Sequence, residues 1–365
     1  MNSRERLLTA IENKKPDRLP CQVHNWMQYY LDNYLHGMDQ YQAYDYFDMD
    51  AVIYTSPHYI IDDSQLSKWQ SKYLDFGISP KGRKCYGFEY TTPEGVLRHC
   101  YEGNEFTFWE TEYLVKTEAD MELFLKYYPV ASKVDWTPVL DAKKKIGDRG
   151  IVRSHHNNFG QPGVWQCITM LMGVENTILK ALGEPDFIKN AAERITKKCL
   201  AGIEAMGKIE VDIIENGGGA ASSTVISPAM YKEFCLPYDK QIHDALKAGQ
   251  TKVVYHLCGG LMHMLELAAQ NGADGLETMT PAAMGGDCIL SEAAERVGDK
   301  LFFIGGFDQN AGFEKGTKKN IEEQVHALFN AKPRGGYICS PSDHFFFGDP
   351  QNIKYFVDVC KSCRY

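Results

Sequence analysis

The chain has 365 residues, of which 44% are hydrophobic and 24% are charged, and its formal net charge is −9. This composition is typical of a globular protein with a sizeable core. The negative charge argues against nucleic acid as a main partner, because phosphate binding requires a basic face. The sequence contains no apolar run of about 18 residues, and its first residues lack the apolar segment of a secretory signal. We therefore expect a cytoplasmic protein without a membrane span.

Short β-rich segments alternate with longer segments of helical periodicity, a pattern that is typical of βα units and a parallel sheet. No internal repeat or flexible linker divides the chain. Eight such units predict an α/β fold, with one (β/α)₈ barrel domain over residues 1–365. The predicted strands are Leu19–His24, Ala51–Tyr54, Ile151–His155, Val211–Glu215, Lys252–Cys258, Gly275–Thr278, Leu301–Gly305 and Gly336–Ser340.

The interval between the second and third predicted strands does not fit the βα pattern. Its part Gly87–Val115 is rich in Tyr, Phe, Thr and Trp, and Pro93-Glu94-Gly95 has the composition of a hairpin turn. We predict a β-hairpin excursion over one mouth of the barrel.

The eleven cysteines of the chain are spread along its length. A chain of this size needs no disulfides to form a core, so most of these residues are expected to be small buried thiols in a reducing compartment. Cys360 and Cys363 form a C-x-x-C near the C-terminal end. No second pair lies nearby, so we expect no metal or redox role for them.

A histidine and a cysteine end the fifth predicted strand. Side chains alternate between the two faces of a strand, so His256 and Cys258 project to the same side, and glycines follow them directly. The C-terminal ends of barrel strands carry the active site, and these two residues can take two vertices of a tetrahedral zinc site. A buried histidine bonded to a backbone carbonyl would explain this pattern as well.

Cys339 ends the eighth predicted strand and supplies the third candidate ligand. Three protein ligands leave one position free, which is typical of catalytic zinc. The sequence therefore predicts a zinc ion held by His256, Cys258 and Cys339.

Several modest motifs, in a fixed order over nearly the whole chain, resemble the uroporphyrinogen decarboxylase superfamily, and more closely its zinc-dependent corrinoid methyltransferase branch. They are Arg4-Glu5-Arg6-Leu7-Leu8, Lys15 to Pro20, Thr92-Pro93-Glu94-Gly95, Ile226-Ser227-Pro228, Leu236-Pro237-Tyr238, Gly272-Ala273-Asp274, Gly305-Gly306-Phe307-Asp308 and Gly335-Gly336-Tyr337-Ile338. The methyltransferases of this superfamily share an H-x-C…C zinc signature, which His256, Cys258 and Cys339 match. The decarboxylase carries an early arginine-rich stretch that binds substrate carboxylates. Pro20–Met27 of this chain holds no arginine, which makes porphyrinogen decarboxylation the less favoured reading.

The resemblance implies one of two methyl-transfer reactions, each of which uses a single zinc ion. In O-demethylases zinc polarises the oxygen of a methyl donor while Co(I) of a corrinoid attacks the methyl carbon. In the alternative, a methylcorrinoid:thiol methyltransferase, zinc supplies a thiolate. We favour O-demethylation of a small methylated substrate, because aromatic residues in the excursion and in His344–Phe347 could line an aryl-sized pocket, although they would pack a lid equally well.

The resemblance implies that a separate small corrinoid-binding protein carries the corrinoid, because the chain lacks the histidine motif of a B12 domain. The chain could form a homodimer. A barrel that binds the corrinoid protein without catalysis is a further alternative, against which the intact zinc signature argues.

Other polar residues near the predicted strand ends are candidates for the site. Glu215 could protonate a leaving alkoxide or complete the zinc shell, and Glu277 is a second catalytic candidate. Substrate-binding candidates are His155, Asn157, Asn216, Asp343 and His344. For each of them a hydrogen-bonding or capping role is the alternative.

Overall fold

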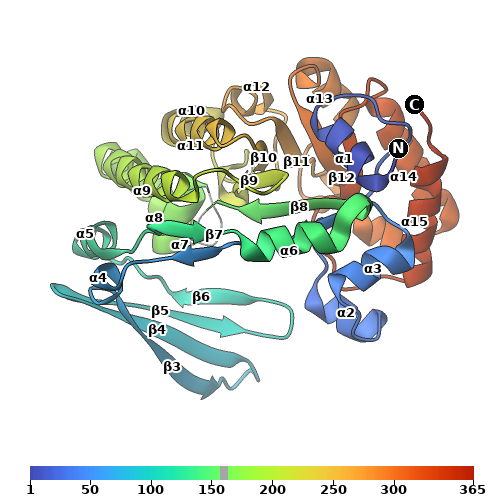
Figure 1. Ribbon diagram of the computed structural model, residues 1–365. Helices are drawn as coiled ribbons and strands as arrows, with labels where there is room; N and C mark the ends of the chain where they lie inside the picture. The colour runs from blue at the N-terminus through green and yellow to red at the C-terminus, as the bar shows by residue number, and fades with distance from the viewer. Residues whose placement is uncertain (157–162) are drawn as a thin grey trace.

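The computed structural model describes residues 1–156 and 163–365. Its central element is a curled sheet of seven parallel strands in the order β1-β8-β9-β10-β11-β12-β13, with helices around its outside (Figure 1). The strands are β1 Ala51–Tyr54, β8 Gly150–His155, β9 Ile213–Gly217, β10 Lys252–His256, β11 Gly275–Thr278, β12 Phe302–Phe307 and β13 Tyr337–Pro341.

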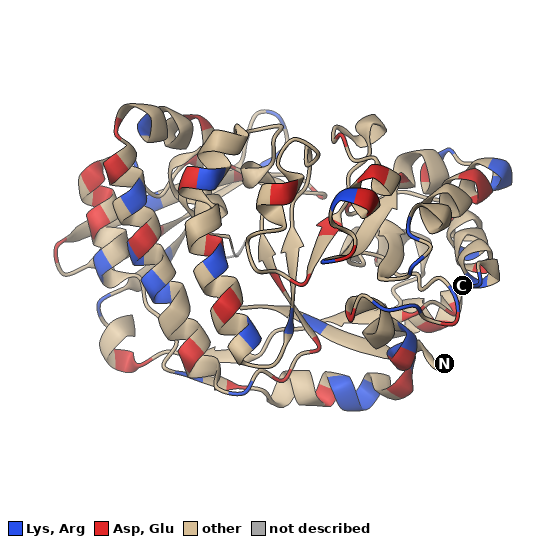
Figure 2. Cartoon of the chain, turned by 90° about the horizontal axis from the view of Figure 1, so that it is seen from above, with Lys and Arg blue, Asp and Glu red and all other residues tan. Residues whose placement is uncertain are grey.

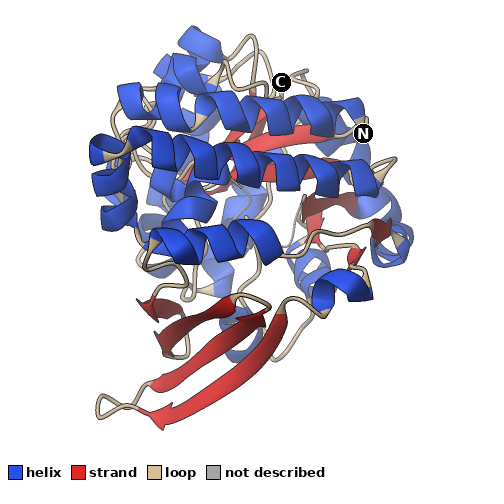
Figure 3. Ribbon diagram, turned by 90° about the vertical axis from the view of Figure 1, so that its left-hand side faces the viewer, coloured by secondary structure: helices blue, strands red, loops and turns tan. Residues whose placement is uncertain are grey.

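Helices connect successive strands and cover the convex face of the sheet (Figure 3). The α-helices are α1 Ser3–Ile11, α2 Gln28–Tyr34, α3 Gln40–Phe47, α4 Asp63–Leu66, α5 Glu118–Tyr127, α6 Thr137–Ile146, α7 Val164–Met172, α8 Val174–Gly183, α9 Pro185–Met206, α10 Pro228–Phe234, α11 Leu236–Ala248, α12 Leu265–Ala268, α13 Leu290–Val297, α14 Lys318–Ala331 and α15 Pro350–Ser362. Local sequence sets several of their starts. Asn2 and Glu5 form a capping box at α1, and Ser227 caps α10 ahead of Pro228.

The first predicted strand, Leu19–His24, is present as a single parallel bridge between Cys21 and Cys339 on β13. The amide of Gln22 also donates to the carbonyl of Cys339. The sheet therefore consists of seven strands with this segment along its β13 edge, and the eight-stranded closed barrel that the sequence predicts is represented only in part.

The excursion after β1 is larger than the single hairpin predicted from the sequence. It forms a four-stranded antiparallel sheet of β3 Gln70–Ile78, β4 Lys84–Thr92, β5 Gly95–Gly103 and β6 Phe108–Glu112, which stands apart from the parallel sheet in Figure 1. Thr92 pairs with Gly95 at the tight turn between β4 and β5. The short strands β2 His58–Ile60 and β7 Lys133–Asp135 form a separate antiparallel pair.

Two hydrophobic clusters define the two faces of the parallel sheet. On the concave face, Leu7, Ala10 and Ile11 of α1 pack against side chains near the N-terminal ends of the strands. These strand residues are Val52, Ile151, Ile213, Val254, Phe302, Ile304 and Ile338. The larger cluster fills the space between the convex face and the outer helices. Because side chains alternate, the concave cluster fixes which later residues of each strand point inward.

Charged residues of both signs are interspersed along the outer helices (Figure 2). No helix in the described ranges is long and apolar enough to cross a membrane.

Candidate active site at the C-terminal edge of the sheet

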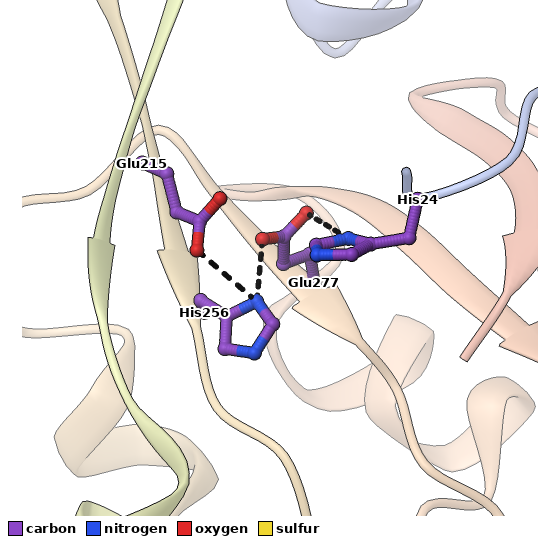
Figure 4. A group of neighbouring side chains, drawn as sticks. All are labelled: His24, Glu215, His256 and Glu277. Atoms are coloured by element: carbon purple, nitrogen blue, oxygen red, sulfur yellow. Dashed lines mark hydrogen bonds and ion pairs between the residues drawn. The ribbon is translucent and has the colours of Figure 1, made fainter. Parts of the chain in front are cut away.

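Four buried side chains converge on the concave face at the C-terminal edge of the strands. They are His24, Glu215 of β9, His256 of β10 and Glu277 of β11, and their ligand atoms all lie within 4.8 Å of one another. Figure 4 shows both carboxylates directed at the His256 ring. Alternation brings them there, since Glu215 stands two residues after Ile213 and His256 two residues after Val254, both of which lie in the concave cluster.

The two ring nitrogens of His256 have different partners. Its Nδ1 lies 2.7 Å from Oε1 of Glu277 and 3.5 Å from Oε1 of Glu215. Its Nε2 lies 2.7 Å from Sγ of Cys258. The pKa of His256 is raised well above its usual value, because Cys258 and Glu215 outweigh the opposing effect of burial. A carboxylate on one nitrogen and a thiol on the other is the environment of a histidine that ligates a metal through Nε2.

Arg153 of β8 lies between the two carboxylates. Its Nη2 is 2.6 Å from Oε2 of Glu215 and also donates to Oε1 of Glu277. Burial of this group is nearly complete, at 1% exposure. The guanidinium lies 4.9 Å from the ring centroid of Tyr54, the last residue of β1. A permanent cation therefore already occupies the space between Glu215 and Glu277.

The two glutamates are in opposite states of charge. Burial and the neighbouring Glu277 raise the pKa of Glu215 to about 8. Burial also opposes ionisation of Glu277, yet Arg153 and the two histidines hold the pKa of that carboxyl well below its usual value. At neutral pH the pair thus carries one proton, on Glu215, and one negative charge, on Glu277.

Two more histidines, His155 and His344, lie beside this group. The His24 ring lies 5.1 Å from that of His256 and 4.8 Å from that of His344. Burial lowers the pKa of His24 well below its usual value, and burial together with Arg153 lowers the pKa of His155 to about 4. These two imidazoles are therefore neutral at physiological pH and can act as metal ligands or as hydrogen-bond acceptors.

Cys339 is not brought to this group. Ile338 lies in the concave cluster, so the next residue points to the convex face, where the thiol of Cys339 lies beside that of Cys360 on α15. Cys339 is fully buried there. The sequence placed Cys339 at a strand end, and that position is right, but the alternation of β13 turns its side chain away from His256 and Cys258.

The other predicted site residues divide into two groups. His155 and His344 lie beside His24 and Tyr54 at the edge of the sheet. Asn216 points to the convex face instead, where it is buried between His156 and His243. Asp343 accepts a hydrogen bond from the amide of His344 and so has a local capping contact. Asn157 lies outside the described residues.

The sequence analysis missed His24, Arg153 and Tyr54 as members of the site. Two signals in the sequence could have found them. Arg153 stands two residues before His155 and so shares its face of the strand, and His24 and Tyr54 each end a predicted strand. A cavity of about 480 Å³ beside α2 and α3 has Asn25, Trp26, Tyr41 and Tyr54 in its wall, and Tyr54 also contacts Arg153 at the site. A cavity of this size can hold a small organic molecule.

The family model for uroporphyrinogen decarboxylase (URO-D) matches residues 161–363, which is more than half of the chain. The chain belongs to the uroporphyrinogen decarboxylase family. Uroporphyrinogen decarboxylase of Neisseria gonorrhoeae is 32% identical over 175 residues, which is 46% of this chain and 45% of that protein. The chloroplastic uroporphyrinogen decarboxylase 2 of Oryza sativa subsp. japonica is 26% identical over 195 residues, or 51% of this chain and 45% of that protein.

The matched segment thus spans less than half the length of these URO-D relatives, so their whole activity does not transfer with the family name. Among solved structures, a methyltransferase from Methanosarcina mazei superposes with a TM-score of 0.65 at 13% sequence identity, and 99% of each chain is covered. This similarity shows a shared fold over the whole chain. Members of one fold carry out different reactions, so the residues at the edge of the sheet decide the chemistry.

Proposed function

We propose that this URO-D family member is a zinc-dependent methyltransferase, which moves a methyl group from a small methylated substrate to the cobalt of a corrinoid on a separate protein. The observation that carries the proposal is the pair of His256 Nε2 and Cys258 Sγ, 2.7 Å apart at the C-terminal edge of the sheet. The methyltransferase from Methanosarcina mazei shares the fold over the full chain, which is compatible with this reaction.

The donor set fits zinc. Imidazole and thiolate are the protein ligands that zinc prefers, and the carboxylate of Glu277 on Nδ1 would keep the other nitrogen of His256 free for the metal. His24 is the candidate third ligand, because its neutral ring lies next to that of His256. Glu215 and Glu277 are less suitable as ligands, since Arg153 Nη2 already bonds to both of them.

The chemistry that zinc would supply here is polarisation of the oxygen that carries the methyl group, or of a thiol in the alternative reaction. The chain's own residues would do the rest. Glu215 keeps its proton at neutral pH and could donate it to an alkoxide as the methyl group leaves. Glu277 fixes the orientation of His256, and the aromatic wall beside Tyr54 would hold the body of the substrate.

Decarboxylation is the competing candidate, because the curated relatives carry that name. A porphyrinogen with many carboxylates would require several cationic groups on the concave face. Among the described site residues the permanent cation is Arg153, and Glu215 and Glu277 already contact it. The site therefore favours a smaller substrate.

The test is a turnover assay with purified protein, zinc, free cob(I)alamin and a panel of small methyl ethers. We expect methylcobalamin to form with wild-type protein, and its rate to fall at least about 100-fold in Cys258→Ala, since zinc polarisation contributes several kcal/mol. Cys85→Ala, which changes a thiol on remote β4, is the matched control and should keep full activity.

Two further arms separate the alternatives. Methylcobalamin with thiol acceptors tests the reverse type of transfer, and uroporphyrinogen tests decarboxylation. Full methyl transfer by zinc-free protein, or turnover of uroporphyrinogen without any methyl transfer, would overturn the proposal.

A further inference from the structure

Arg153 has donor groups that no described residue uses. Its Nη2 serves Glu215 and Glu277, but its Nε and Nη1 have no hydrogen-bond partner within residues 1–156 and 163–365. The side chain is only 1% exposed, so bulk solvent does not satisfy these groups. A buried guanidinium with open N–H groups is costly unless something accepts from it.

Gln22 presents a second set of open groups on the same face. Cys21 points outward, where its thiol contacts Cys360, so alternation turns Gln22 to the concave side. Both the oxygen and the nitrogen of its side-chain amide lack a partner among the described residues, and the residue is 1% exposed. Gln22 stands two residues before His24, as Arg153 stands two residues before His155. Both therefore lie one layer beneath the histidines at the edge of the sheet.

The residues above this layer are less deeply buried. His155, Tyr54 and Cys258 are half-buried, and His344 is exposed. A ligand that enters at the edge of the sheet would therefore meet His155 and His256 first, with Arg153 and Gln22 beneath them. Arg153 and Gln22 together offer mainly hydrogen-bond donors, and Arg153 carries a permanent positive charge.

We propose that Arg153 and Gln22 form a carboxylate-binding subsite, so that the substrate is a small molecule with a carboxylate group. A carboxylate oxygen can accept from Nη1 of Arg153, and the amide nitrogen of Gln22 can donate to the same group. The negative charge of the adjacent Glu277 would repel a dianion such as phosphate more strongly than a monoanion, which favours a carboxylate. The charge of Arg153 disfavours a cationic group in the lower layer.

This inference deepens the proposed function, on which it rests for the position of the reacting methyl group beside His256 and Cys258. Binding of a carboxylate, however, can be measured without turnover and without metal. The two proposals can therefore fail separately.

The experiment is isothermal titration of the protein with acetate and benzoate, and with acetamide and benzamide as neutral molecules of the same shape. We expect the carboxylates to bind at least about tenfold more tightly than the amides, which is the effect of one charge-assisted hydrogen bond. Arg153→Lys keeps the charge beside Glu277 but removes the open donors, and should weaken carboxylate binding about tenfold. Gln22→Met conserves the shape without touching the ion pairs and should weaken it several-fold, while the surface variant Gln270→Met should bind as wild type does.

Titration of Cys258→Ala separates this subsite from a metal that binds carboxylates directly. Carboxylate affinity that survives in Cys258→Ala and falls in Arg153→Lys supports the subsite. Affinity that disappears in Cys258→Ala and is unchanged in both Arg153→Lys and Gln22→Met would overturn it, as would equal binding of carboxylates and amides. If Arg153→Lys does not fold, Gln22→Met decides, and its unchanged carboxylate affinity would reject the proposal.

Discussion

His256 Nδ1 lies 2.7 Å from Oε1 of Glu277, on the neighbouring strand of the sheet. The same carboxylate contacts Arg153, so one buried acid links the imidazole of His256 to the guanidinium at the site. This relationship fixes the imidazole so that its other nitrogen faces Cys258. We expect it to govern metal affinity at the site.

Glu277→Gln should weaken zinc binding about 10- to 100-fold, since an amide orients His256 less firmly than a carboxylate does. Competition with a chromogenic chelator would measure the dissociation constant. Glu292→Gln, on the exposed side of α13, is the matched control and should bind zinc as wild type does. Unchanged zinc affinity in a folded Glu277→Gln protein would show that this carboxylate has no role in metal binding.

Cys339→Ala should retain its zinc, because the Cys339 thiol packs beside Cys360 on the convex side of β13. We expect it to lower the free energy of unfolding by about 1–2 kcal/mol, as other deletions of buried groups do. Metal analysis and urea unfolding of the same sample check both points. Loss of zinc from a folded Cys339→Ala protein would instead restore the three-ligand set predicted from the sequence.

The buried Glu215 should make the metal-free protein less stable as the pH rises. Its pKa is about 8 in the folded state, against a usual 4.5, so between these values the unfolded chain loses a proton that the folded chain keeps. Stability relative to Glu215→Gln should therefore fall over that range, by at most about 1.4 kcal/mol per pH unit, and become level above about pH 8. Urea unfolding of both proteins from about pH 5.5 to pH 8.5 measures this difference. A difference that grows in favour of wild type with rising pH would contradict the assignment.

Asp50 should be important for stability rather than for catalysis. It is fully buried and accepts hydrogen bonds from Arg6, Arg18 and the amide of Cys21, which hold the N-terminal segment against the sheet. Asp50→Asn leaves the buried Arg18 without its charge partner and Arg6 with Asp17 alone, and should cost about 3–5 kcal/mol. The exposed ion pair of Glu193 and Lys197 provides the comparison, since Glu193→Gln should leave the free energy of unfolding nearly unchanged in the same assay.

Alternation along the strands accounts for both the success and the failure of the sequence-based site. His256 and Cys258 lie two residues apart, so the prediction that they share a face needed no knowledge of the rest of the chain. Glu215 and Glu277 were found because they end strands, and the structure brings them to His256. For Cys339 the strand was predicted, but the sequence did not tell which face of that strand lies on the concave side, and a packed neighbour was needed to decide it. That neighbour is Ile338, whose place in the concave cluster became known only from packing.

The sequence by itself determined the βα order, the parallel strands and the H-x-C pair, because hydrophobic periodicity and residue spacing are local properties of the chain. The tertiary structure decided that Arg153 lies between two glutamates, that His24 joins His256, and that Cys339 faces away. The physical reason is that these relations join strands far apart in sequence. Which side chains meet across the concave face depends on strand order, register and the curl of the sheet, and no local pattern encodes those three together.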